Sequence, residues 1–278
     1  MYYIYLIGNV LASILPRNVC YCLAKIFALI HFYLSRKDRE AVLYNLYPVI
    51  DDKKNLKKYA KEVFINFSYY LVDFYKFPKL DHGFIKEYVK VSGLESLNHC
   101  LSLKNGVIVL TAHLGNYELA GAVTSLLGYP LSVVALPHKD KRINQFFDDR
   151  RESFGMKVIP TGIALKGCLA ALKRGDLLAL LGDRDFSGSK LKLEMFGKEA
   201  YFPRGGAFFA SKTEACVVPA FLVRENKNFY HLKFEKPLSV FGEHKDREKS
   251  IMRQYISVLE RYIKKYPQQW YLFEKYWL

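Results

Sequence analysis

The sequence contains few of the residues that build disulfide frameworks and metal sites. Its 278 residues include five cysteines, at positions 20, 22, 100, 168 and 216, with no C-x-x-C pair and no cluster with histidine. This spacing argues against a disulfide scaffold and against a zinc site, because both need paired or clustered cysteines. We therefore expect buried, reduced thiols in a protein that faces the cytosol, and no bound metal.

Acidic residues are also scarce. The chain has 42 Lys and Arg against 27 Asp and Glu, which gives a formal net charge of +15 at pH 7. Basic groups at 36–39, 53–58 and 139–142 spread this excess along the chain. Such a surface attracts anionic lipid headgroups, an acidic carrier protein or nucleic acid. No RNA- or DNA-binding motif accompanies the charge, so we expect no nucleic-acid partner.

No uncharged apolar run reaches the roughly 20 residues that a membrane-spanning helix requires. Residues 1–15 carry no side-chain charge, Pro16 and Arg17 interrupt the run, and the second run, 19–34, contains Lys25. No basic segment or small-residue cleavage site marks a secretory signal. We expect a helix pair embedded in one leaflet and anchored by the basic residues at 36, 37 and 39. A single tilted span and two core helices of a soluble domain are the alternatives.

From residue 106 onwards, short apolar segments alternate with helical ones. We expect strands at 107–112, 131–136, 156–160, 177–182, 191–195, 216–223 and 229–234, and helices at 117–127, 140–153, 163–174, 205–212 and 247–265. This alternation predicts an α/β fold with a largely parallel central sheet flanked by helices. The preceding part reads as mostly helical. We therefore divide the chain into a membrane-associated helical segment, 1–37, and one catalytic domain, 38–278.

The most informative stretch is Leu110–Gly121, which places a histidine at a strand end and a carboxylate in the next helical turn. Gly115 permits a sharp turn between them, and Asn116 suits a helix N-cap. Glu118 is favoured at the helix N-terminus and could fold back to hold His113 in one tautomer. The other ring nitrogen would then accept a proton from a bound alcohol, without any protein nucleophile. The spacing alone also fits a hydrogen-bonded core histidine.

A second polar group follows the expected strand at 177–182. Asp183, Arg184 and Asp185 come directly after it, and ligands of open α/β sheets collect at the carboxyl ends of the strands. A guanidinium between two carboxylates is suited to a phosphate or a developing oxyanion. The alternative is a structural Asp–Arg pair that holds the loop. Either way, this group is a substrate-site candidate.

The string His-Leu-Gly-Asn-Tyr-Glu-Leu-Ala-Gly at 113–121 resembles the central motif of the lipid A late acyltransferase family, the lauroyl and myristoyl type. The segments 183–189 (with Ser187 in its glycine-containing loop), 196–207 and 266–278 resemble further elements of that family. Met195 stands where the family usually has an aromatic residue, which puts the wall of an acyl groove in doubt. The closing segment holds both tryptophans, and we expect it either on the core or at headgroup level.

The resemblance implies that a fatty acyl chain moves from a thioester, on acyl carrier protein or coenzyme A, to a hydroxyl of a phosphorylated glycolipid such as a lipid A precursor. The site would be at the cytoplasmic face of the inner membrane, without another cofactor. His113 would be the base and Glu118 its orienting acid, while nearby amides or Arg151 would stabilise the oxyanion. No Gly-x-Ser-x-Gly elbow indicates a covalent serine. A lysophospholipid or glycerolipid acceptor and an inactive basic scaffold are the alternatives.

Three further residues are substrate-binding candidates. The family has an Arg-x-x-x-Gly element that maps onto Arg151, four residues before Gly155, although the adjacent Arg150 leaves the register open by one. Asn144 lies seven residues earlier, on the same helical face. Arg224, at the end of an expected strand, is a candidate for a phosphate contact. The arginines could instead be merely solvated surface charges.

Overall fold

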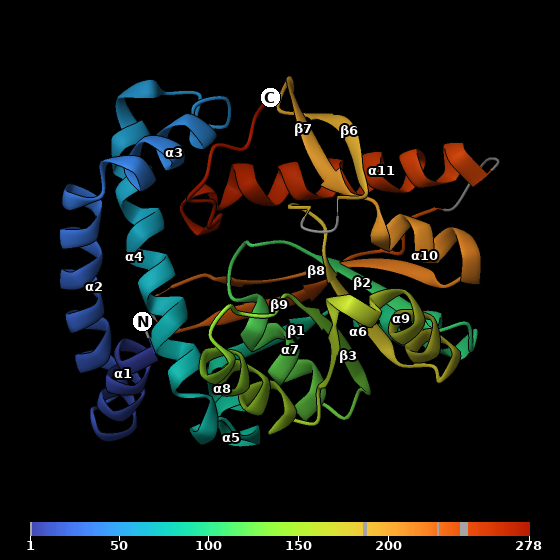
Figure 1. The fold of residues 1–278 in the computed structure, drawn as a ribbon, viewed down its shortest axis with the longest axis horizontal. Helices are drawn as coiled ribbons and strands as arrows, with labels where there is room; N and C mark the ends of the chain where they lie inside the picture. Colours follow the sequence, from blue (N-terminus) through green and yellow to red (C-terminus); the bar gives the residue numbers. More distant parts are fainter. Residues whose placement is uncertain (1, 186–187, 227, 240–243) are drawn as a thin grey trace.

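A mostly parallel seven-stranded sheet forms the centre of the protein (Figure 1). The computed structural model describes residues 2–185, 188–226, 228–239 and 244–278. Strand order is β1-β9-β8-β2-β5-β3-β4, and every neighbouring pair is parallel except β8–β9. The strands are β1 (Val89–Ser92), β2 (Val107–Thr111), β3 (Leu131–Ala135), β4 (Lys157–Pro160), β5 (Leu177–Leu181), β8 (Cys216–Arg224) and β9 (Tyr230–Phe234). The predicted α/β class with a largely parallel sheet is confirmed.

Helices flank the sheet and a separate antiparallel hairpin extends from it. The helices are α1 (Tyr2–Ile14), α2 (Arg17–Leu34), α3 (Arg36–Leu46), α4 (Leu56–Tyr75), α5 (His82–Tyr88), α6 (Leu94–Ser102), α7 (Tyr117–Leu126), α8 (Lys141–Glu152), α9 (Ala164–Lys173), α10 (Gly205–Thr213) and α11 (His244–Lys265). The hairpin consists of β6 (Lys190–Met195) and β7 (Lys198–Pro203). Strands β1 and β7 and helix α6 were not predicted from the sequence. Each is short and lacks a long apolar pattern.

The central strand β2 is buried on both faces, as an all-apolar run predicts. Val107 and Val109 pack into the cluster shared with α5 to α8, whereas Ile108 and Leu110 pack into the cluster shared with α9 to α11. Side chains alternate across a strand, so these pairs fix β2 between two helical layers. The carboxyl end of β2 is therefore a rigid platform for whatever follows it.

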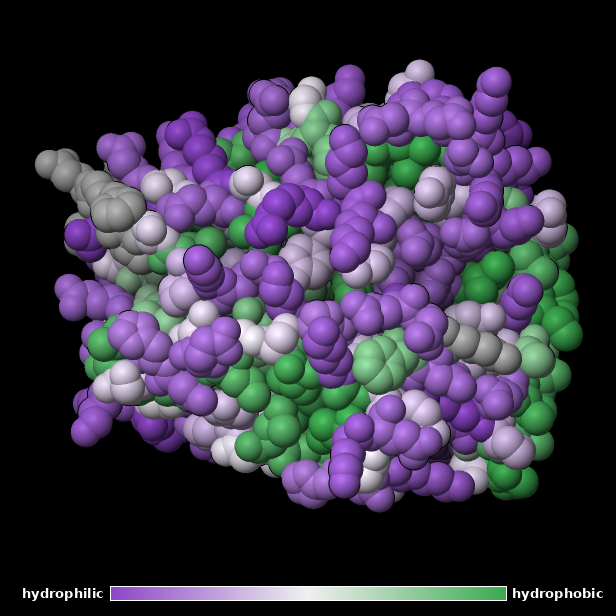
Figure 2. Space-filling view, turned by 180° about the vertical axis from the view of Figure 1, so that it is seen from behind, coloured by the Kyte–Doolittle hydropathy of each residue, from purple (hydrophilic) through white to green (hydrophobic). Residues whose placement is uncertain are grey.

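The amino-terminal helices leave a broad apolar surface uncovered. Helix α2 packs on α4, which lies between α2 and the sheet (Figure 1), and buries Tyr21 and Phe32. The outer side chains stay exposed: Leu6, Ile7, Val10, Leu11 and Ile14 of α1, and Val19, Leu23, Ile26, Phe27, Ile30, Tyr33 and Leu34 of α2. Figure 2 shows hydrophobic residues along the edge of the molecule on which these helices lie. We call this set the apolar face.

Within the described residues, no single helix is long and apolar enough to cross a membrane. Helices α2 and α3 meet the length and composition requirement only together, and they are bent by 91° with respect to each other. The expected pair of apolar helices is present as α1 and α2. Their attachment to one leaflet stays a prediction.

The cysteines can be compared with the expectation of buried, reduced thiols. All five cysteines are free, and burial raises the pKa of Cys100 to about 12 and that of Cys168 to about 11. Cys22 is exposed, so the expectation of buried thiols is wrong at that position.

The closing segment packs on the core, because Trp270 and Trp277 are 2% and 7% exposed.

Candidate active site

His113 lies two residues beyond β2, and its ring is held by a carboxylate from the neighbouring strand. Nδ1 of His113 is 2.9 Å from Oδ1 of Asp183, which follows β5. The backbone N–H of His113 donates to Oδ2 of the same carboxylate at 3.0 Å. Strands β2 and β5 are paired in parallel, so their carboxyl ends meet at one edge of the sheet. This pairing brings together residues that are far apart in sequence.

Asp183 is completely buried, with 0% of its surface exposed. Burial alone would raise its pKa, but the His113 ring and hydrogen bonds from His113 and Trp270 outweigh that effect, and the pKa is lowered. The Trp270 indole nitrogen lies 3.4 Å from Oδ2. An ionised carboxylate only accepts hydrogen bonds, so Nδ1 of His113 carries the proton and Nε2 is the basic nitrogen.

Glu118 has a different partner from the one that we expected. Its two carboxylate oxygens accept from Nε and Nη2 of Arg151, at 3.1 and 2.5 Å. Arg151 lies on α8, which packs against α7, and both side chains are largely buried. The orienting contact that the sequence analysis gave to Glu118 belongs to Asp183. In the first turn of α7, the Glu118 side chain points to α8, a direction that spacing along the chain does not reveal.

Of the other predicted residues on α8, Asn144 shares a partner with Arg151, whereas Arg150 does not. Arg151 also donates to Asp148 at 3.2 Å, and Asn144 donates to Asp148 at 2.7 Å. Arg150 turns the other way and donates to the Asn9 side chain of α1. Of the two adjacent arginines, Arg151 is therefore the one that joins the motif glutamate. Its role toward a substrate stays a prediction.

The turn that carries His113 is fixed by backbone hydrogen bonds from the closing segment. Tyr271 N–H donates to the His113 carbonyl at 2.7 Å, and Gly115 N–H donates to the Gln269 carbonyl at 2.8 Å. Gly115 has φ 67°, and a Cβ there would lie 2.0 Å from the Leu222 carbonyl oxygen, so only glycine fits. This clamp was not predicted, because no local pattern links a distant tail to the turn.

The amides of this turn are already engaged. Besides Gly115, the N–H of His113 bonds Asp183, and the N–H of Asn116 donates to the Leu222 carbonyl at 2.8 Å. These three donors therefore do not form an oxyanion site. The expectation that nearby amides stabilise an oxyanion is not met at these positions.

A second buried carboxylate, Asp73 of α4, organises a polar cluster beside the turn. Arg224 donates to Oδ2 of Asp73 at 2.7 Å and Arg17 to Oδ1 at 3.0 Å. The Asp73 cluster consists of Asp73, Arg17, Tyr21, Asn116, Arg224 and Tyr230. The Arg224 side chain is 9% exposed and forms an internal ion pair with Asp73, while its predicted phosphate contact stays a prediction. Asp73 belongs to no sequence motif and was not predicted.

Asn116 connects the Asp73 cluster to α7. Its Nδ2 donates to Asp73 at 3.1 Å, and its Oδ1 accepts from the backbone of Leu119 at 3.0 Å. The predicted N-cap is confirmed, and Asp73 fixes which way the amide points. The position of the helix start thus depends on a carboxylate from another helix.

Arg184 contacts the closing segment, and Asp185 contacts the loop that follows it. Arg184 forms an ion pair with Glu274 of the closing segment at 2.7 Å, and Asp185 accepts from the Gly188 N–H at 3.0 Å. Phe186 and Ser187 of the predicted loop lie outside the described residues. Asp183 therefore joins His113, while Arg184 pairs with the tail. No group of three or more His, Cys, Asp or Glu side chains able to hold a metal ion occurs among the residues with described positions.

Comparison with known proteins gives the family. A sequence model described as bacterial lipid A biosynthesis acyltransferase matches residues 1–278. A phosphatidylinositol mannoside acyltransferase of Mycolicibacterium smegmatis is 24% identical over 223 residues, covering 77% of this chain and 70% of that protein. One from Mycobacterium tuberculosis is 24% identical over 160 residues, covering 55% and 51%. A lipid A biosynthesis acyltransferase of Haemophilus influenzae is 22% identical over 130 residues, covering 46% and 41%.

The family match covers the whole chain and agrees with the motif at 113–121, so the resemblance is confirmed. The His113–Asp183 pair is a site at which such an activity can be tested. The chain belongs to the bacterial lipid A biosynthesis acyltransferase family and is an acyltransferase.

Proposed function

We propose that this acyltransferase moves a fatty acyl group from a thioester to a hydroxyl group of a phosphorylated glycolipid, with His113 as the general base. The observation that carries the proposal is the 2.9 Å contact between His113 Nδ1 and the buried, ionised Asp183. It makes Nε2 the basic nitrogen and gives the imidazolium a nearby negative charge. The family and the glycolipid acyltransferases among the relatives support the substrate class.

The proposed reaction needs one proton carrier. Nε2 of His113 removes the proton of the acceptor hydroxyl, and the oxygen attacks the thioester carbonyl carbon. The tetrahedral intermediate collapses when the C–S bond breaks, and the imidazolium returns its proton to the thiolate. The products are an ester and a free thiol. No cofactor takes part beyond the co-substrate thioester.

The donor is acyl carrier protein or acyl-coenzyme A. Both carry negative charge, and the net charge of +15 favours either of them electrostatically. A two-arm assay with the same acyl chain on each carrier separates these donors. The preferred donor is the one with the higher kcat/KM, and a basic surface that guides a carrier predicts a rate that falls with added salt.

We propose that the apolar face lies in the cytoplasmic leaflet of the inner membrane. Its side chains include Phe27 and Ile30, which are 67% and 47% exposed, and the basic residues at 36, 37 and 39 follow directly. Phe27→Ser with Ile30→Ser should lower the sedimentation of the protein with vesicles. Leu103→Ser removes an equally exposed leucine from α6's end and is the matched control. Equal sedimentation of all variants would refute the attachment.

Deleting the amino-terminal helices is a poorer test. Arg17 and Tyr21 of α2 both bond Asp73, so their removal would leave that carboxylate with fewer partners. A loss of activity on deletion would then mix membrane release with damage to the cluster. Exposed positions avoid this ambiguity, since surface substitutions usually change stability by less than about 0.5 kcal/mol.

The reaction itself is tested with purified protein, a defined acyl thioester and candidate acceptors in mixed micelles. Mass spectrometry should find an acylated glycolipid, and the free thiol should appear at the same rate. Acylation of a lysophospholipid in preference to every glycolipid offered would reject the proposed acceptor class. Thiol release with no acylated lipid in any arm would reject transfer by this chain under those conditions.

A further inference from the structure

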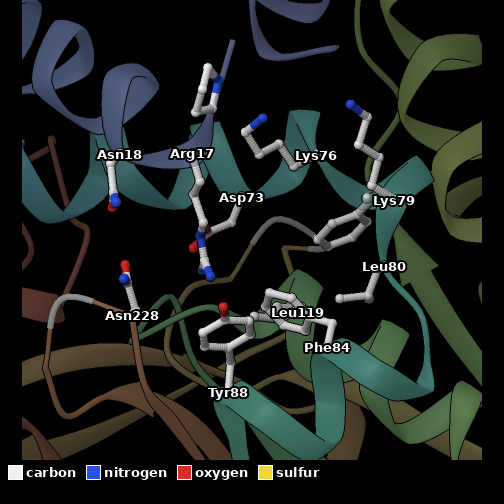
Figure 3. A pocket seen from close by; sticks show the side chains of 12 residues that line it. Arg17, Asn18, Asp73, Lys76, Lys79, Leu80, Phe84, Tyr88, Leu119 and Asn228 are labelled. Carbon is white, nitrogen blue, oxygen red and sulfur yellow. The ribbon is translucent and has the colours of Figure 1, made fainter. Parts of the chain in front are cut away.

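A cavity of about 220 Å³ lies between the start of α2, the end of α4 and α5 (Figure 3). Its lining includes Arg17, Asn18, Asp73, Phe84, Tyr88 and Asn228. Neither His113 nor Asp183 belongs to this lining. The volume is below the roughly 300–1,000 Å³ of sites that enclose a drug-sized ligand. The cavity therefore suits a headgroup fragment rather than an entire lipid.

Arg17 stands at the centre of this cavity (Figure 3). Its Nε donates to the Tyr21 hydroxyl at 2.7 Å, and its Nη2 donates to Asp73 at 3.0 Å and to Tyr230. The ring centroids of Phe84 and Tyr88 lie 5.0 and 5.7 Å from the Arg17 guanidinium carbon. Nη1 has no hydrogen-bond partner within the described part of the chain. Arg17 is thus locked in place by one side of its fork while two N–H donors remain for a ligand.

Two amides face each other across the same cavity. Asn18 and Asn228 both line it, and their amide groups point toward one another in Figure 3. Oδ1 of Asn228 is buried and has no hydrogen-bond partner among the described residues. A buried polar atom without a partner costs free energy, which a ligand donor such as a hydroxyl would recover.

The charge balance of the cavity is positive. Asp73 contributes its carboxylate, but Arg224 pairs with it from the far side at 2.7 Å. Lys76 and Lys79 add two positive charges, with ammonium groups that cap carbonyls at the end of α1, at 2.6 Å to Ala12 and 2.8 Å to Ser13. These lysines make the electrostatic potential of the cavity more positive, but their ammonium groups bond the carbonyls of α1. Arg17 is therefore the donor to an anion.

We infer that this cavity binds a phosphate ester that also carries hydroxyl groups, as a glycerol phosphate or sugar phosphate headgroup does. The two N–H groups on Arg17 Nη1 would bond the phosphate oxygens, in the geometry that suits arginine. The amides of Asn18 and Asn228 would bond the hydroxyls. Phe84 and Tyr88 would flank the carbon skeleton.

The place of the cavity decides where such a ligand comes from. Pro16 and Arg17 form the junction of α1 and α2, the helices that carry the apolar face. A lipid beside that face would present its headgroup at the helix junction that carries Arg17. A free phosphate ester would bind through the same atoms, so the two sources need separate measurements.

In the first experiment, glycerol 3-phosphate is titrated into the 278-residue chain in neutral detergent, and the heat of binding is measured by calorimetry. Inorganic phosphate and glycerol are the comparison ligands, and no acyl donor is present. Saturable binding should be tightest for glycerol 3-phosphate. Asn228→Ala should weaken it by roughly two- to tenfold, because one hydrogen bond is lost. Arg17→Lys should weaken it by about tenfold or more, because the fork is lost. Lys212→Gln, an exposed charge on α10, should change nothing.

The second experiment identifies the source. Vesicles of phosphatidylglycerol, which has both a phosphate and hydroxyls, are compared with vesicles of phosphatidylcholine. Competition of phosphatidylglycerol with glycerol 3-phosphate assigns the site to a lipid headgroup, and its absence assigns the site to a free ester.

Two results would overturn the inference. One is the lack of saturable binding by glycerol 3-phosphate. The other is that inorganic phosphate binds as tightly as glycerol 3-phosphate and that Asn228→Ala leaves the affinity for glycerol 3-phosphate unchanged. The Asn228→Ala variant keeps the Arg17–Asp73 pair and should fold. Neither result depends on acyl transfer, so the proposed reaction and this site can fail separately.

Discussion

Two buried aspartates stand on either side of the turn that carries His113, and they differ in what they hold. Asp183 is 0% exposed and bonds a histidine and a tryptophan. Asp73 is 5% exposed and bonds two arginines from different elements. Both carboxylates are hydrogen-bonded, as buried charges must be. Only the first has an imidazole as its partner, the kind of side chain that can serve as a general base.

This difference separates a chemical role from a positioning role. A carboxylate beside imidazole stabilises the charge that appears when the ring takes a proton. A carboxylate between two permanent guanidinium groups meets no change of charge during any reaction. Asp73 instead fixes Asn116 and with it the start of α7. The comparison therefore predicts that Asp183 matters most for rate and Asp73 most for stability.

The largest expected effect is that of His113→Ala. Loss of the base should lower the rate of acyl transfer by about 10²–10⁴-fold or more. Initial rates with a defined thioester and glycolipid measure it, and His99→Ala, an exposed histidine, is the matched control. A rate within tenfold of wild type would contradict the role of His113 as the general base.

Asp183→Asn should come close to this loss, on the order of 10²–10⁴-fold in kcat. An amide can donate to Nδ1, which favours the wrong tautomer and removes the charge that stabilises imidazolium. Rates measured over a range of pH test it, together with circular dichroism to verify the fold. An unchanged kcat would mean that the 2.9 Å contact holds the ring without assisting the chemistry.

Asp73→Asn should mainly cost stability. Arg17 and Arg224 would each lose their charge partner, and breaking a buried ion pair typically costs about 3–5 kcal/mol. Urea unfolding monitored by fluorescence gives the value, with Asp81→Asn, an exposed helix cap, as the comparison. A loss below that of the control would show that the cluster is not a structural centre.

A smaller effect is expected in the free energy of unfolding at acid pH. The pKa of Asp183 is lowered in the folded protein, so the unfolded chain binds its proton first as the pH falls. Its stabilising contribution is complete above the unfolded value of about 3.9 and is lost as the pH falls through the lower folded value. In that window, Asp183→Asn should make unfolding free energy less dependent on pH by up to about 1.4 kcal/mol per pH unit. Equal slopes would contradict the shift.

Among the described residues, local patterns predicted the position of His113 and the strands other than β1 and β7. A buried apolar run followed by Gly115 and Asn116 fixes a strand, a turn and a helix start from contacts within a dozen residues. The placement of Asp183 at a strand end followed from the same reasoning. What the pattern could not supply was the strand order, and it is the pairing of β2 with β5 that brings Asp183 to His113.

The errors came from contacts between distant segments. Glu118 was assigned to His113 because the two are close in sequence, yet helix packing turns it to Arg151. Asp73 lies in an aromatic helix with no motif, and its partner Arg224 is 151 residues away. Local propensity contains no information about such pairs. The sequence signal for Asp73 is that it is the single charged residue in the apolar and aromatic run 63–75 of α4.

The smallest expected effect separates Glu118 from Asp183. Glu118→Gln keeps the size and one hydrogen bond to Arg151 but removes the charge of a pair whose oxygens lie 3.1 and 2.5 Å from the guanidinium. Since Glu118 does not hold Nδ1 of His113, kcat should fall by roughly tenfold or less, with some loss of stability from the unpaired arginine. Arg151→Lys, which keeps the charge and loses the fork, should act in the same direction.

If both change KM for the acceptor rather than kcat, the pair shapes the binding site. If Glu118→Gln lowers kcat as far as Asp183→Asn does, the chemical role is shared between the two carboxylates, and the contrast between Asp183 and the rest of the site no longer holds.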